Sequence, residues 1–234
     1  LSTDQIASFT TTQASALATN QIMALTSEQI QNISTKNLNA LTLQQVTALA
    51  PSQIMALTPD QVKNLTDEKL ASLTAVQVGF LTTAQIDGLT TSQFANFTPT
   101  QIKGLTASQI ISINPADIGG MTNEQIAALT TLQVQSLTDA QITILNESQI
   151  GYLTPAQLAA MTSAQTAKIS TSDLRALSAL QLRALTNDQV AGLTTAQVNA
   201  VFTDQLTALT VEQVSFMEYD DLNAMSSEQI KALT

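Results

Sequence analysis

The chain has 234 residues, of which 44% are hydrophobic, 11% charged and only 3% aromatic, and this composition is too apolar for a disordered chain. It contains neither Cys nor His, which excludes disulfides, thiolate metal sites and histidine-based acid–base catalysis. The eighteen acidic and eight basic residues give a net charge of −10, so nucleic acid is not an expected partner.

The whole chain is an eight-residue repeat. Written in rows of eight from Leu1, residues 1–232 form 29 complete octads without insertion or deletion, and residues 233 and 234 begin another. The consensus is L-T-x-x-Q-I-x-A, with Thr at position two in 18 octads, Gln at position five in 24, and Ile, Val, Leu or Phe at position six in 27. The pattern predicts one continuous solenoid over residues 1–234, with no internal domain boundary.

Each octad carries the start and stop signals of one short helix, beginning with residues 3–8 and 11–16 and ending with residues 227–232. The Thr at position two and the Gln at position five form a capping box. All five prolines occupy position three, the first helical residue, and all seven glycines occupy position seven or eight, where a helix ends. Seventeen of the eighteen acidic residues lie at positions two to five, as the helix dipole favours.

The alternatives to one helix per octad fail on geometry. In a single long helix the apolar stripe would rotate by about 80° per octad and would never be buried. In a strand, positions one and six would fall on opposite faces. Helices of about six or seven residues cannot survive alone. We therefore expect an all-α fold, a tight solenoid of about 29 very short capped helices, with positions one and six inside, small position-eight residues at the corners and positions three, four and seven outside.

Few side chains depart from the repeat. Phe80, Tyr152 and Phe216 replace small corner residues and are candidates for lateral contacts, with local packing as the alternative. Asp117, Asp173 and Asp221 replace Gln at position five, where a carboxylate is expected to cap the helix equally well.

One acidic cluster has two interpretations, and one of them is a metal site. Glu218 and Asp220 share an octad with Asp221, and the three are either helix-start acids or oxygen ligands for a divalent cation. No nucleophile is paired with a base. We predict no catalytic, cofactor-binding or metal residues, and no enzymatic activity.

The two ends of the array are expected to expose apolar surface. Ile6, Phe9 and Leu17 lie in the first octads, Met225, Ile230 and Leu233 lie in the last, and neither end resembles a polar capping repeat. The repeat makes the two ends complementary, so copies should stack head to tail into a filament, unless the chain is a segment of a longer array.

The L-T-x-x-Q octads along the whole chain resemble the octapeptide arrays of large secreted or surface proteins of bacteria, including adhesin-like ones. This resemblance implies an extracellular or cell-surface location and a structural role as a spacer, fibre or surface-layer element. Residues 1–20 do not read as a signal peptide, and no apolar run is long enough for membrane insertion. The alternative function is a binding or adhesion module that presents its variable positions to a protein or glycan. A third possible function is ice binding by the regularly spaced Thr residues.

Overall fold

A computed structural model describes residues 1–233, and over this range the chain folds into 29 short helices with no strand. The helices are four to six residues long, slightly shorter than expected. They are shorter because positions one and two are extended and position eight often forms the C-cap, as Ser8 does. The prediction of an all-α array with one helix per octad is confirmed.

The chain divides into two compact units, residues 1–120 and the part from Met121 onward. The first unit contains α1 (Thr3–Ala7), α2 (Thr11–Ser15), α3 (Thr19–Met23), α4 (Ser27–Asn32), α5 (Thr35–Ala40), α6 (Leu43–Thr47), α7 (Pro51–Ala56), α8 (Pro59–Lys63), α9 (Asp67–Ser72), α10 (Ala75–Gly79), α11 (Thr83–Asp87), α12 (Thr91–Ala95), α13 (Pro99–Gly104), α14 (Ala107–Ser112) and α15 (Pro115–Gly119).

The second unit contains α16 (Asn123–Ala128), α17 (Thr131–Gln135), α18 (Asp139–Ile144), α19 (Glu147–Tyr152), α20 (Pro155–Ala160), α21 (Ser163–Thr166), α22 (Thr171–Arg175), α23 (Ala179–Arg183), α24 (Asn187–Ala191), α25 (Thr195–Ala200), α26 (Thr203–Leu206), α27 (Val211–Ser215), α28 (Tyr219–Ala224) and α29 (Ser227–Ala232).

The helix boundaries follow from the capping boxes. At the start of α13 the Thr98 hydroxyl accepts the Gln101 backbone N–H at 3.2 Å, and Gln101 Oε1 accepts the Thr98 backbone N–H at 2.8 Å. Pro99, like the other four prolines, is the first residue of its helix, where a backbone N–H has no partner inside the helix. The helices therefore begin where the sequence predicts.

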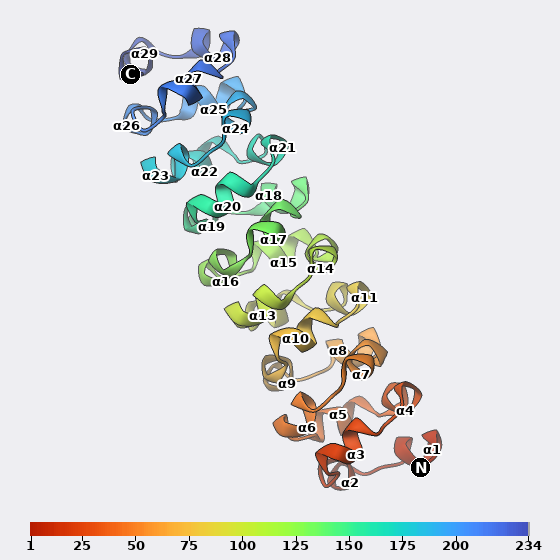
Figure 1. Cartoon of the computed structure of the whole chain (residues 1–234). Helices are drawn as coiled ribbons and strands as arrows, with labels where there is room; N and C mark the ends of the chain where they lie inside the picture. Colours follow the sequence, from red (N-terminus) through yellow and green to blue (C-terminus); the bar gives the residue numbers. More distant parts are fainter. Residues whose placement is uncertain (234) are drawn as a thin grey trace. The chain divides into compact units, whose positions relative to one another are not determined.

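Within each unit a helix packs on the third helix along the chain. The pairs include α1 with α4 and α10 with α13 in the first unit, and α19 with α22 and α25 with α28 in the second. Three octads therefore complete one turn, which we call a coil, and the coils stack along the unit (Figure 1). Both units are helical solenoids.

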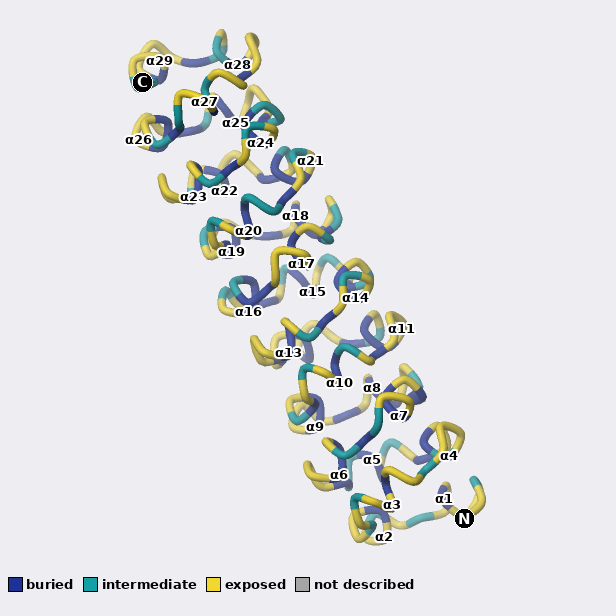
Figure 2. The backbone as a smooth tube through the Cα atoms, in the orientation of Figure 1, coloured by how far each residue is buried: buried dark blue, intermediate teal, exposed yellow. Residues whose placement is uncertain are grey.

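The core lies inside the coils. Ile86 at position six is 0% exposed and Leu89 at position one is 5% exposed. Thr100 and Lys103, at positions four and seven, are exposed. Figure 2 shows buried and exposed stretches alternating along every octad. The predicted inside and outside positions are confirmed.

Position eight is small because neighbouring coils meet there. A Cβ atom on Gly104 would lie 2.2 Å from the carbonyl oxygen of Ala75, the first residue of α10. On Gly192 it would lie 2.9 Å from the Cβ of Ser163, again the first residue of a helix one coil earlier. No described residue has a positive φ, so at these sites glycine is required for close approach.

Candidate functional site

A buried glutamine at position five joins each coil to the preceding one. In the second unit, Gln189 Oε1 accepts the Thr186 backbone N–H at 2.7 Å, which caps α24. Its Nε2 donates to the carbonyls of Leu158 at 2.7 Å and Met161 at 2.6 Å. The last carbonyls of a helix have no partner within that helix. Gln189 therefore caps the start of one helix and the end of another.

The same bonds recur at regular intervals in both units, and we call this series the glutamine ladder. Gln53 donates to the carbonyls 31 and 28 residues earlier, those of Ile22 at 2.7 Å and Leu25 at 2.8 Å. Gln101 repeats the pattern with Leu70 and Leu73, both at 2.8 Å. Other ladder members include Gln45, Gln61, Gln77, Gln85, Gln109, Gln157, Gln165, Gln197 and Gln205.

The sequence pattern predicts the capping bond of this glutamine but not its bond to the preceding coil. A signal for it was present. Glu can serve in a capping box as well as Gln, yet no octad has Glu at position five. Only the amide carries both the acceptor for the cap and the donor for the preceding coil.

The aspartates at position five do not act as glutamine does, contrary to the prediction. None of the three makes a capping box, and neither does Asn37, because these side chains are one methylene shorter than glutamine. A carboxylate also supplies no N–H for the preceding coil, so each side chain has a different environment. Asp117 accepts the Thr91 hydroxyl at 2.5 Å, and Asp173 accepts the hydroxyl of its own N-cap, Ser170, at 2.5 Å. Asp221 is 3% exposed, and its Oδ2 is buried without a hydrogen-bond partner.

The first coil leaves its glutamine donors free. Gln5, Gln13 and Gln21 are exposed, and their side-chain amides make only the capping bond. The predicted apolar end residues are covered to different extents: Ile6 is 1% exposed, whereas Phe9 and Leu17 are half-buried. The edge of this coil is therefore partly apolar and rich in amide donors.

The last coil exposes apolar residues that are buried elsewhere. Ile230 at position six is 45% exposed, whereas Ile102 at the same position in the first unit is 0% exposed. Of the other predicted end residues, Met225 is 8% exposed and Leu233 is half-buried. Ile6 and Met225 are thus already buried within one copy of the chain. The exposed apolar surface at the two ends comes mainly from other residues of these coils, such as Ile230.

The three predicted lateral residues are exposed. Phe80 is 37%, Tyr152 52% and Phe216 46% exposed, so all three are accessible for contacts with another molecule. Tyr152 borders an open hollow of about 510 Å³ that Glu147, Ser148 and Gly151 also line.

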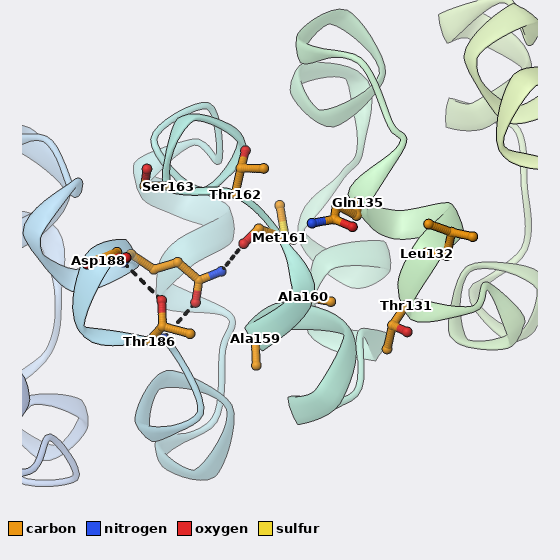
Figure 3. A pocket seen from close by; sticks show the side chains of 11 residues that line it. Thr131, Leu132, Gln135, Ala159, Ala160, Met161, Thr162, Ser163, Thr186 and Asp188 are labelled. Atoms are coloured by element: carbon orange, nitrogen blue, oxygen red, sulfur yellow. Dashed lines mark hydrogen bonds between the residues drawn. The ribbon is translucent and has the colours of Figure 1, made fainter.

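A second hollow, of about 480 Å³, crosses neighbouring coils of the second unit (Figure 3). Leu132 and Asp188 lie toward opposite ends of it, and Ala159, Ala160 and Ser163 contribute small side chains between them. The hollow holds hydroxyl, methyl and carboxylate groups, which can form hydrogen bonds and apolar contacts with a ligand.

Glu218, Asp220 and Asp221 do not converge. Glu218 and Asp220 are exposed, Asp221 is buried, and residues 1–233 contain no group of three or more acidic side chains placed to hold a metal ion. Within these residues no helix is long and apolar enough to cross a membrane.

Residues 166–202 match a protein family described as the ALTTAQ repeat. The matched segment includes α22 to α25, and Leu193–Gln197 reads L-T-T-A-Q. No curated protein matches the chain. The match and the regular helical array identify the chain as a repeat protein.

Proposed function

We propose that this repeat protein is a structural element, a spacer, fibre or surface-layer component outside a bacterial cell, and not an enzyme. The observation that carries the proposal is the glutamine ladder. Each coil offers amide donors on one edge and backbone carbonyls on the other, so coils can be added without a change in the bonding pattern. The extracellular location rests on the resemblance to octapeptide arrays of secreted bacterial proteins.

End-to-end association would extend the ladder from one copy to the next. Gln5, Gln13 and Gln21 supply unused donors. In the octad phase they would meet the carbonyls of Leu209, Met217 and Met225 on a second copy, where residue 1 of one copy takes the place of residue 233 of the other. The same contact would cover Ile230 and the half-buried Phe9 and Leu17. Such a head-to-tail contact does not close and therefore builds a filament.

The test is sedimentation velocity of residues 1–234 over a wide concentration range. We expect the sedimentation coefficient to rise with concentration. A triple variant, Gln5→Glu with Gln13→Glu and Gln21→Glu, keeps the capping oxygens, removes the donors and should remain monomeric.

The matched control places the same three charges elsewhere. Gln31, Gln44 and Gln135 are exposed and lie outside position five, so their replacement by Glu should leave association intact. A wild type that stays monomeric at every concentration would refute assembly through the ends. Equal loss of association in both triple variants would mean that the added negative charge, and not the loss of the amide donors, prevents association.

The alternative function, glycan binding, is favoured by the hollow at Tyr152. An exposed aromatic ring beside Glu147 and Ser148 combines an apolar face with polar groups, which is the chemistry that sugar rings require. Binding to a glycan array by the wild type, and its loss in Tyr152→Ala but not in Phe80→Ala, would support this function.

A further inference from the structure

Asp221 is the one described residue with a buried side-chain oxygen that lacks a hydrogen-bond partner. The side chain is 3% exposed and lies in α28 at position five, the ladder position. A buried acceptor without a donor is destabilising, and a buried charge more so. This oxygen is therefore open to a ligand that the chain itself does not supply.

The flanking glutamines show where the Asp221 carboxylate is directed. Gln213 donates to the carbonyls of Arg183 at 3.0 Å and Leu185 at 2.6 Å, which are 30 and 28 residues earlier. Gln229 donates to the carbonyls at the same intervals. The equivalent carbonyls for residue 221 are those of Ala191 and Leu193.

A side chain as short as aspartate reaches this place. Asn37, also at position five, donates through Nδ2 to the Phe9 carbonyl, 28 residues earlier, at 2.7 Å. Asparagine and aspartate have the same length, and Asp221 has no hydroxyl partner of the kind that Asp117 and Asp173 have. We therefore expect Asp221 to direct a carboxylate oxygen toward the Leu193 carbonyl, so that two hydrogen-bond acceptors face each other there.

The surroundings of Asp221 add negative electrostatic potential, and the helices that pack there supply no basic side chain. The Ala191 carbonyl belongs to the C-terminal end of α24, which carries the negative pole of the helix dipole. Helix α28 packs on α25, and neither helix contains Lys or Arg. Within residues 1–233 the single ion pair joins Lys168 to Asp139, at 3.3 Å.

We infer that Asp221 binds a divalent cation of the calcium type, together with the backbone carbonyls of Ala191 and Leu193. Carboxylate and carbonyl oxygens are the ligands that Ca²⁺ takes, and water completes its flexible coordination. The cation lies between the carboxylate and the two carbonyls, and it joins α28 to the preceding coil as a glutamine amide does at the other ladder positions. The inference is independent of end-to-end association, because its ligands lie within the second unit.

The other two aspartates at position five differ from Asp221 in having hydrogen-bond donors. Asp117 accepts a hydrogen bond from Thr91, and Asp173 accepts one from Ser170. Their carboxylates already have donors, so only Asp221 requires an ion.

The test is amide hydrogen exchange of residues 1–234, first freed of metal with a chelator and then titrated with CaCl₂. When free Ca²⁺ exceeds its dissociation constant tenfold, exchange of the amides of residues 217–224 should slow about tenfold. In Asp221→Asn the amide replaces the ion, so exchange should be slow without Ca²⁺ and insensitive to it. Asp117→Asn and Asp220→Asn should retain the response of the wild type.

Three results would overturn the assignment. The first is a wild type whose exchange does not respond to millimolar Ca²⁺. The second is an Asp221→Asn variant that responds as the wild type does. The third is an equal effect of KCl at matched ionic strength, which would assign the response to general screening of the acidic surface.

Discussion

Glutamine at position five makes bonds that no other residue type supplies together. Gln101 illustrates this, with Oε1 on its own N-cap and Nε2 on two carbonyls of the preceding coil. Glutamate would keep the first bond and lose the others. This combination explains why position five is almost uniform while positions three, four and seven vary.

The variant Gln101→Glu tests the bond between coils. Gln101 is 2% exposed, so the change buries a carboxylate against the carbonyls of Leu70 and Leu73. We expect a loss of about 3 kcal/mol in the free energy of unfolding, measured by urea denaturation. Gln44→Glu, at an exposed position, should change it by less than about 0.5 kcal/mol. Similar losses in the two variants would mean that the ladder adds nothing to stability.

The individual helix owes its boundaries to local signals and its stability to its neighbours. A helix of four to six residues is too short to be stable alone. The capping boxes, Pro99 and its counterparts, and the acidic first turns specify where each helix begins, so the sequence predicts the helices well. The close approach at Gly104 cannot be predicted from its own octad, because the Ala75 carbonyl that it meets belongs to another coil.

Two glycine substitutions distinguish close approach from helix propensity. In Gly104→Ala the new Cβ would lie 2.2 Å from the Ala75 carbonyl oxygen, and the backbone must shift. We expect a loss of about 2 kcal/mol. In Gly151→Ala the nearest contact is 3.7 Å, so the higher helix propensity of Ala should add about 0.5 kcal/mol. Thermal unfolding of the two variants should shift in opposite directions, and equal shifts would contradict this packing.

Aspartate substitutions in α13 test the assignment of inside and outside. Ile102 is 0% exposed, so Ile102→Asp places an unpaired charge in the core and should cost more than about 4 kcal/mol. Thr100→Asp adds the same charge at an exposed site in the first turn of the helix, where the dipole favours it. Denaturant midpoints should separate the two variants clearly. A Thr100→Asp variant as unstable as Ile102→Asp would reverse the assignment.

At the scale of the whole molecule, sequence periodicity predicts a solenoid but not its pitch. Three octads complete a coil because α10 packs on α13, and this depends on how Gly104 and Ala75 fit together across coils. The consensus of a single octad contains no information about how many octads separate two helices that pack on each other. The candidate sites show the same limit: Tyr152 was predicted from its departure from the consensus, whereas the unpaired oxygen of Asp221 emerged only from the coil geometry.

The most direct test of the glutamine ladder is hydrogen exchange of the glutamine side-chain amides, observed by NMR at low protein concentration. The Nε2 protons of ladder members such as Gln53 and Gln101 should exchange slowly, because they are bonded to buried carbonyls. Those of Gln5, Gln13 and Gln21 should exchange rapidly and become protected only as the concentration rises. A single fast rate for all glutamine side chains would contradict the account.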